Sequence, residues 1–440
     1  MLIPLTIPYY PRRSRNHDIS YREMFMKAYF SQTQLRRIGI GIIMILHAAI
    51  WCMANAQATD APRFSLITCA PGKEIYQLEG HEALRIRMGG GIDLAVNWGL
   101  FDFNSPNFLY RFVKGETDYM AGAYPFAIFL EEYEKEGRRV VEQEINLTPR
   151  QASRLLALVE ENLLTENRTY RYNYVKDNCA TRPFELIERA AGTPVIFTEA
   201  DTVAANTSFR SEMTRYHKNY PWYQFGIDMA LGSGIDYNIT QRERIFAPVE
   251  LERALDDAYF LMPDGNRIPV VTKSAILLPG PEEGVAEGPT PLLLTPVAAG
   301  WYLLLLTIAV SIPDLRRHRL SRWFDSTLYG IQFLAGCLLT FLIFISVHEA
   351  TSPNWLYLWL NPLCALPAIG IWIKSWKRVV YWYQICNFAA LTVLLSAHSL
   401  LGQALNAAFP LFILCALIRS AIEIYMLHPR HTSDIMKRKK

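Results

Sequence analysis

The feature that most constrains this 440-residue chain is a set of long uncharged segments in its C-terminal third. Runs without Asp, Glu, Lys or Arg cover 291–313, 326–348, 350–373 and 379–418, and the last run is long enough for two crossings of a bilayer. A transmembrane helix needs ~20 consecutive, mostly apolar residues. The sequence therefore predicts five transmembrane helices, near 292–312, 326–347, 355–373, 379–397 and 404–425.

Basic residues between these segments indicate how the helices are oriented. Clusters of Lys and Arg fall at 316–322, 374–378 and 437–440, which all lie on one side of a five-helix arrangement. The positive-inside rule places that side in the cytoplasm. We therefore expect 59–290 on the opposite side of the membrane.

The segment over 59–290 has the composition of a soluble domain. It carries 24 basic and 34 acidic residues, whereas 291–427 carries only 8 and 4. The formal net charge of +3 thus combines an acidic exported domain with basic flanking parts. The scarcity of charged residues in 291–427 excludes a single soluble enzyme. Because a phosphate-binding groove needs clustered Lys and Arg, the acidic balance also argues against a nucleic-acid partner.

The N-terminal part has the features of an export signal. Basic residues at 36–37 precede an apolar run at 38–51 and small residues at 54–58. The expected domains are an N-terminal extension with a signal sequence or signal anchor at 1–58, an exported domain at 59–278, a linker rich in Pro and Gly at 279–291, the membrane helices at 292–427, and a basic cytoplasmic tail at 428–440.

Local patterns predict several elements of the exported domain. Alternating or continuous apolar residues predict strands at 64–68, 83–88, 93–98 and 139–147, with a hairpin turn centred near Gly90. Thr148 and Gln151 have the spacing of a capping box, which predicts a helix over 149–164. Asn178 is expected to cap a second helix that begins at Cys179 and closes at Gly192.

Two cysteines, Cys69 and Cys179, lie in the expected exported domain. In an oxidising compartment such a pair can form a disulfide. The setting of Cys179 favours a nucleophile instead, because the first turn of a helix lowers the pKa of a thiol and can stabilise an oxyanion. The residues alone leave both interpretations open.

A thiol nucleophile needs a base, and His81 is the candidate. It opens a predicted strand, on the face opposite Leu84 and Ile86. Across the hairpin, a turn near Gly90 places Asn97 on the same face, where its side chain could fix the tautomer of the ring. The alternatives are a packing histidine and a hydrogen-bonded sheet asparagine.

The sequence contains further candidates for substrate binding. Arg182 and Arg85 could meet a phosphate or form structural ion pairs, Arg182 with Asp177 or Glu185. His348 is expected at the outer membrane surface, where it could contact lipid headgroups, support the site or have no role. The full set comprises Cys179, His81 and Asn97 for catalysis, Asn178, Ala180 and Tyr174 for the oxyanion or support, and Arg182, Arg85, His348 and Trp98 for substrate binding. The sequence contains no metal-binding cluster and no cofactor motif.

Several motifs together resemble one family. They are Leu66-Ile67-Thr68-Cys69-Ala70-Pro71-Gly72 with Gly80-His81, the segment 97–103, Gly137-Arg138, Asn146-Leu147-Thr148, and Asp177-Asn178-Cys179-Ala180-Thr181-Arg182. This set resembles the periplasmic domain of the Bacteroides-type lipoprotein N-acyltransferase (Lnb) family. The membrane part, with His348, 353–355 and 361–362, is similar to the same family. The order of His before Cys also resembles circularly permuted papain-like proteins such as lecithin retinol acyltransferase relatives.

The resemblance implies an α+β, permuted papain-like periplasmic domain followed by an all-α domain of five transmembrane helices in the bacterial inner membrane. It also implies acyl transfer in two steps, without a cofactor. Cys179 would take an acyl chain from a membrane phospholipid as a thioester, and the α-amine of a diacylglyceryl-cysteine lipoprotein would collect it.

Two other functions remain open from the residues. One is a membrane-anchored thiol peptidase or amidase that uses the same Cys and His on peptidoglycan. The other is a non-enzymatic sensor or scaffold in which Cys69 and Cys179 form a disulfide.

Overall fold

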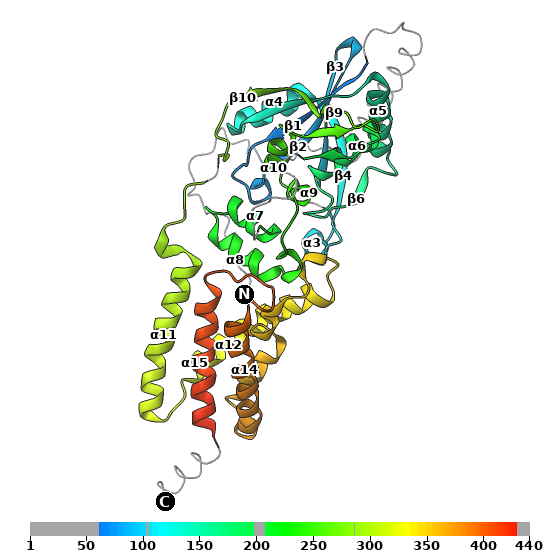
Figure 1. Ribbon diagram of the computed structural model, residues 1–440. Coiled ribbons are helices and arrows are strands. Elements are labelled where there is room, and N and C mark those ends of the chain that lie inside the picture. Colours follow the sequence, from blue (N-terminus) through cyan, green and yellow to red (C-terminus); the bar gives the residue numbers. More distant parts are fainter. Residues whose placement is uncertain (1–60, 103–104, 198–206, 286, 429–440) are drawn as a thin grey trace, which may run out of the picture.

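The computed structural model describes residues 61–102, 105–197, 207–285 and 287–428. The expected signal segment at 1–58 and all but the first residue of the expected tail lie outside these ranges. A domain containing two sheets precedes a helical region, and Figure 1 shows the two parts stacked end to end.

The first part is built on a seven-stranded sheet with the strand order β10-β5-β1-β2-β3-β4-β6. Each neighbouring pair in this sheet is antiparallel. The strands are β1 (Arg63–Cys69), β2 (His81–Met88), β3 (Ile92–Leu100), β4 (Asp118–Pro125), β5 (Val140–Ile145), β6 (Thr169–Arg171) and β10 (Val271–Leu278). A second sheet joins β7 (Val195–Ile196), β8 (Tyr259–Leu261) and β9 (Arg267–Pro269) in that order.

The hairpin of β2 and β3 confirms the register that the sequence predicts. Ala83 pairs with Asn97 and Met88 with Ile92, so the turn is centred on Gly90. Gly90 has a φ of 76°, a backbone conformation that glycine adopts without the steric cost that a Cβ adds. The alternation along β2 then places His81, Ala83 and Arg85 on one face of the sheet.

Helices cover both faces of the large sheet. On the His81 face, Phe126 and Phe129 of α4 (Phe126–Glu136) pack against Ala83 and Ala95. On the other face, α5 (Pro149–Leu163) and α6 (Thr181–Ala191) join Leu84 in the main core. The Thr148–Gln151 capping box and the end of α6 at Gly192 are confirmed, whereas α6 begins at Thr181 rather than at Cys179.

Five further helices belong to this part of the protein. They are α3 (Phe108–Lys114), α7 (Phe209–Tyr216), α8 (Pro221–Ala230), α9 (Gln241–Arg244) and α10 (Pro248–Leu255). In Figure 1, α3 and α8 lie at the end of the domain that meets the helical region. The segment between β10 and that region packs on the domain, since Val285 N–H donates to Pro71 O.

Four helices are long and apolar enough to cross a membrane, as far as the described residues show. They are α11 (Pro296–Arg317), α12 (Arg322–Phe344), α14 (Lys377–Ala397) and α15 (Phe409–Leu427). They correspond to the first, second, fourth and fifth of the predicted transmembrane helices. The count of five continuous helices is therefore not confirmed.

The prediction of a continuous third helix over 355–373 is wrong. The segment instead forms two 3-10 turns, η6 (Trp355–Leu358) and η7 (Pro362–Cys364), and the short helix α13 (Ala365–Gly370). Pro362 and Pro367 lack the backbone N–H that a helix needs, and the Asn361 side chain accepts the N–H of Leu363 to start a new turn.

This broken segment follows α12 closely. Thr351 donates to Leu342 O near one end of α12, and Ser326 donates to Ala368 O near the other. Between them the backbone of Asn361 lies so close to Gly336 that a Cβ there would approach within 2.4 Å. The segment therefore spans most of the length of α12 without forming one continuous helix, which broken helices can do at membrane depth when protein covers their free backbone groups.

A buried ionic cluster ties together the ends of the helices opposite the sheet domain. Arg419 of α15 is fully buried and pairs with Asp314 of α11 at 2.8 Å and with Asp325 of α12 at 2.6 Å. A lone charge at this depth would be costly, so each partner depends on the others. The cluster fixes how α11, α12 and α15 pack.

Candidate functional site

His81 and Asn97 form a hydrogen-bonded pair at one end of β2. His81 Nε2 lies 2.8 Å from Asn97 Oδ1, and Asn97 is buried. Because that oxygen accepts, Nε2 carries the proton and Nδ1 keeps its lone pair. The predicted proximity of the two residues is confirmed; their part in catalysis stays a prediction.

Burial sets the charge of His81. It lowers the pKa of the imidazole to about 4, with a smaller contribution of the same sign from the positive charge of Arg138. The hydrogen bond with Asn97 acts in the opposite direction, because it favours the protonated ring. His81 is therefore neutral at pH 7 and can accept a proton.

The thiol of Cys179 lies beside the same end of β2. The backbone N–H of Glu82, the residue after His81, lowers the pKa of the thiol, as do the N–H of Cys179 itself and the hydroxyl of Tyr172. Two backbone amides and one hydroxyl therefore lie close to the sulfur. Chain folding has brought Cys179 next to a strand residue 97 positions earlier in the sequence.

The prediction that the helix start lowers the pKa of Cys179 is wrong. Burial raises the pKa of this thiol to about 12, and the hydrogen bonds from Glu82 N–H and Tyr172 offset only part of that effect. The physical reason is that a thiolate loses its hydration when it is buried, and this loss exceeds what nearby dipoles return. Cys179 is thus a neutral thiol at pH 7, and it shares no hydrogen bond with His81 among the contacts described for these two residues.

Asn178 shapes the turn that carries Cys179. Its side-chain oxygen accepts the N–H groups of Ala180 at 2.9 Å and Thr181 at 3.0 Å, which confirms the predicted capping role. Its amide nitrogen donates to the carbonyl oxygens of Tyr174 and Phe246, both at 2.8 Å. The Ala180 N–H is therefore already engaged, and the amides that face the sulfur are those of Cys179 and Glu82 instead.

Cys69 occupies a different place from Cys179. It lies directly opposite His81 in the pairing of β1 and β2, and it is fully buried in the cluster beneath α4. Both thiols are free, so the disulfide interpretation is wrong. Cys69 packs in the core, whereas Cys179 lies in a turn outside the regular elements.

Tyr172 is a site residue that the sequence reasoning missed. Its hydroxyl contacts the Cys179 sulfur, and its ring stacks on Tyr119 with a centroid distance of 4.4 Å. A Cβ at Gly99 would approach that ring within 3.2 Å, so the glycine leaves room for it. Tyr172 directly follows the end of β6 at Arg171.

The charged candidates for substrate binding are engaged elsewhere. Arg182 pairs with Asp177 at 2.8 Å and stacks over Tyr170, which confirms the ion-pair alternative. Arg85 pairs with Asp93 at 2.6 Å and Glu142 at 3.0 Å. Neither guanidinium has a contact with Cys179 that would place it at the thiol.

The two aromatic candidates differ in exposure. Trp98 is fully buried in the main core, on the sheet face that packs against α6, so it presents no surface to a substrate. Tyr174 is partly exposed, and its ring packs against Phe246. Its carbonyl oxygen holds Asn178, so its support of the turn comes from the backbone.

His348 joins the membrane part to the sheet domain. Its Nε2 lies 2.9 Å from the carbonyl oxygen of Phe112 in α3. The neighbouring Val347 N–H donates to Lys114 O at 2.8 Å. The prediction that His348 lies on the same side as the exported domain is confirmed, and its contact is with protein.

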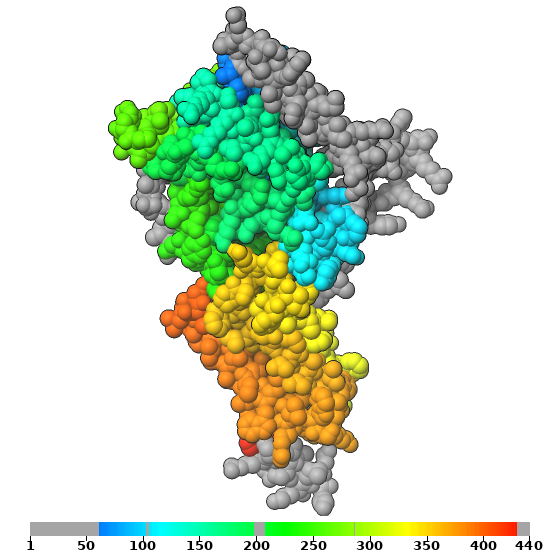
Figure 2. All heavy atoms as spheres, turned by 90° about the vertical axis from the view of Figure 1, so that its right-hand side faces the viewer, coloured from blue at the N-terminus to red at the C-terminus, as the bar shows by residue number. Residues whose placement is uncertain are grey.

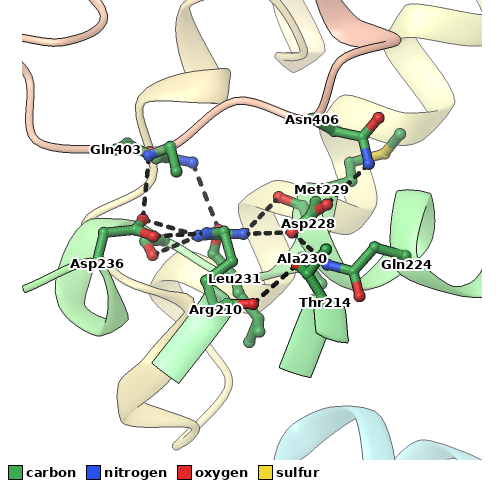
Figure 3. Close-up of polar contacts among 12 residues, drawn as sticks. Arg210, Thr214, Gln224, Asp228, Met229, Ala230, Leu231, Asp236, Gln403 and Asn406 are labelled. Carbon is green, nitrogen blue, oxygen red and sulfur yellow. Dashed lines mark hydrogen bonds and ion pairs between the residues drawn. The ribbon is translucent and has the colours of Figure 1, made fainter. Parts of the chain in front are cut away.

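A second junction lies between α8 and the loop before α15. Arg210 of α7 is buried and binds Asp228 at 3.0 Å and Asp236 at 2.7 Å (Figure 3). From the membrane side, Asn406 Nδ2 donates to the second oxygen of Asp228 at 2.8 Å. Gln403 contributes a weaker hydrogen bond to Leu231 O at 3.4 Å.

The junction continues toward β2 through buried polar groups. Gln224 donates to Asp228 at 2.8 Å, and Gln224 Oε1 lies 2.6 Å from His217 Nδ1. The other ring nitrogen of His217 lies 2.6 Å from Glu79 Oε1, two residues before His81. A line of hydrogen bonds therefore runs from the membrane-side loop to the start of β2.

Comparison with protein families decides what kind of chain this is. Residues 51–208 match the Lnb N-terminal periplasmic domain, and 289–430 match the Lnb transmembrane domain. The chain belongs to the Lnb family. It is therefore a bacterial membrane protein with a periplasmic part, and the sheet domain that carries His81 and Cys179 is that part.

The Lnb periplasmic match ends before α7, so the helices of the Arg210 junction lie beyond it. Neither the search of curated proteins nor that of solved structures finds a match. The permuted papain-like fold therefore stays a prediction. No group of three His, Cys, Asp or Glu within the described ranges is placed to hold a metal ion.

The Arg210 junction leads to a stability prediction. We expect Arg210→Met to destabilise the protein by about 3–5 kcal/mol, because Asp228 and Asp236 would remain buried without their partner. The matched control is Arg253→Met: Arg253 is half-exposed, and its buried partner Glu250 also pairs with Arg215 and Arg244, so its loss should cost about 1 kcal/mol or less. Thermal unfolding in detergent measures both, and equal shifts in the midpoint would contradict the importance of the junction.

Proposed function

We propose that this protein is a lipoprotein N-acyltransferase that moves an acyl chain from a membrane phospholipid through Cys179 to the α-amine of a diacylglyceryl-cysteine lipoprotein. The proposal is supported by the site itself: the buried thiol of Cys179 lies close to the backbone N–H of Glu82, and Glu82 directly follows the neutral His81. That site belongs to a domain docked on the membrane part. Membership of the Lnb family supports the same activity.

The first half-reaction uses His81 as a general base. As the Cys179 sulfur attacks the ester carbonyl carbon of the phospholipid, His81 Nδ1 accepts the thiol proton. The negative charge moves to the carbonyl oxygen, where the N–H groups of Glu82 and Cys179 can stabilise it. Collapse breaks the ester C–O bond, and His81 returns the proton to the departing lysophospholipid oxygen. Cys179 then holds the acyl group as a thioester.

The second half-reaction reverses the roles of nucleophile and leaving group. The neutral α-amine of the lipoprotein attacks the thioester carbonyl carbon, and His81 takes a proton from its nitrogen. Collapse breaks the C–S bond, and the proton passes to the sulfur. Asn97 would keep Nε2 protonated throughout, so that Nδ1 remains the basic nitrogen.

The junctions with the membrane part favour this function over a cell-wall hydrolase. Both proposed substrates are lipids anchored in the outer leaflet of the inner membrane, and His348 and Asn406 hold the sheet domain against the membrane part. Peptidoglycan lies away from that surface. In the proposed orientation, the Arg419 ends of the helices face the cytoplasm and the sheet domain faces the periplasm.

Substitution of the two catalytic candidates tests the proposal. We expect Cys179→Ala to abolish N-acylation and His81→Ala to lower its rate by about 10²–10⁴-fold, because each removes one chemical role. The lipoproteins would then lack one acyl chain, which mass spectrometry of their N-terminal peptides measures. Cys69→Ala serves as the control and should retain the activity.

Full N-acylation in the Cys179→Ala variant would contradict the proposal. Release of peptides from purified sacculi by the native protein, lost in the same variant, would instead support the peptidoglycan hydrolase.

The pKa of His81 predicts the pH dependence. A base with a pKa of about 4 stays neutral down to that pH, so the rate of thioester formation should fall only as the pH drops through about 4. Asn97→Asp places a carboxylate beside the ring, and this negative charge favours the imidazolium. The fall in rate at low pH, the acidic limb of the pH–rate profile, should therefore move to higher pH. Single-turnover rates between pH 3.5 and 8 measure the limb. A native limb near pH 6.5 would contradict the assignment of a buried, neutral base.

A further inference from the structure

The short helix α3 exposes an unusual amount of apolar side chain. Leu109, Tyr110 and Phe112 are 68%, 55% and 47% exposed. Leu109 and Phe112 are three positions apart, so they are neighbours on the surface of this helix. Exposed apolar patches of this kind mark a binding surface or a membrane contact.

The helix α3 lies against the end of α12 that faces the sheet domain. Its carbonyl oxygens at Phe112 and Lys114 accept hydrogen bonds from His348 and Val347, which follow α12 directly. The ring of Tyr110 lies 6.0 Å from that of Phe341, inside the last turn of α12. Figure 2 shows the cyan segment around α3 directly above the yellow outer end of the membrane part.

Because α12 is long and apolar enough to cross a membrane, α3 lies at the level where the bilayer begins. Apolar and aromatic side chains at that level partition into the boundary between headgroups and acyl chains. The basic residues of α3 do not compete with this placement, since Arg111 pairs with Asp118 and Lys114 with Glu116.

A row of aromatic rings connects α3 with Cys179. Phe112 stacks on Phe108 at a centroid distance of 5.9 Å, and Phe108 stacks on Phe101 at 6.0 Å. Phe101 lies 5.2 Å from Tyr119, which stacks on the Tyr172 that contacts the sulfur. Phe112 is exposed, and the other four rings are partly buried.

We infer that α3 inserts into the outer leaflet of the membrane and that the aromatic row, Phe112, Phe108, Phe101, Tyr119 and Tyr172, binds the acyl chain of the phospholipid whose ester reaches Cys179. The second half of this inference rests on the proposed function. An acyl chain fits the row because it is apolar along its length and needs no hydrogen-bond partner. The chain would leave the bilayer beside α3 and follow the rings to the thiol.

Photocrosslinking tests the insertion of α3 independently of catalysis. The full-length Cys179→Ala variant is reconstituted in vesicles of phosphatidylethanolamine and phosphatidylglycerol that contain a phospholipid with a diazirine in its acyl chain. After illumination, mass spectrometry should find the lipid on the peptide that contains α3. The peptide with Ile128 of α4, which is apolar and 51% exposed but lies far from the membrane part, should remain unmodified. Crosslinks confined to α11, α12, α14 and α15 would overturn the inference.

Chain-length selectivity tests the aromatic row. We expect Phe112→Gln to lower the ratio of kcat/KM for a long-chain phospholipid over a short-chain analogue by about tenfold or more, chiefly through KM, because one apolar contact with the chain is lost. Ile128→Gln on α4 should leave the ratio unchanged. An unchanged ratio in Phe112→Gln, with both donors affected equally, would show a merely structural role and overturn the acyl path.

The two experiments separate the inference from the proposed function. If no donor acylates Cys179, the proposed function fails, while lipid crosslinks on α3 would still establish its insertion. If Cys179 is acylated but α3 is never crosslinked, the acyltransferase stands and the insertion fails. Crosslinks from a photoreactive lipoprotein peptide in place of the phospholipid would assign the row to the acceptor and overturn the donor path.

Discussion

The sheet domain contacts the membrane part through a buried ionic junction centred on Arg210. Arg210 holds Asp228 in an orientation that leaves one carboxylate oxygen for Asn406 of the membrane-side loop. Without that guanidinium two buried carboxylates would face each other, so the junction forms as a unit or not at all. The same carboxylate continues through Gln224 and His217 to Glu79, two residues before His81. The polar groups that fix the domain on the membrane thus also support the strand that carries the proposed base.

Burial is the second organising effect, and it changes the kind of chemistry that the site can perform. A thiol whose pKa is raised and an imidazole whose pKa is lowered are both neutral at pH 7. They do not form the thiolate–imidazolium pair that the helix start alone suggests. A neutral pair favours attack with concerted proton transfer, in which the amides of Glu82 and Cys179 stabilise charge only as it develops. Such a site suits substrates that arrive from a membrane, because an acyl chain already excludes water from the thiol.

Features that depend on local interactions could be predicted from the sequence. Contacts between residues far apart in the chain could not. The hairpin register follows from a glycine turn and alternating side chains, so Asn97 could be placed beside His81 correctly. The cap of Asn178 and the Thr148–Gln151 box are likewise local. The contact of Cys179 with Glu82, and that of Asp228 with Asn406, join residues far apart in the sequence and leave no local pattern. The broken segment over 355–373 could have been predicted, since Pro362 and Pro367 disfavour a continuous helix. The prediction of one helix relied on the hydropathy of the segment alone.

In the proposed reaction, Cys179 carries an acyl group taken from a phospholipid. The most direct measurement is intact-protein mass spectrometry of the full chain after incubation with phospholipid and no lipoprotein acceptor. We expect a mass increase of one acyl group that neutral hydroxylamine removes and that maps to the Cys179 peptide. An unmodified protein under conditions in which lipoproteins still become N-acylated, or an acyl group on any other residue, would contradict it.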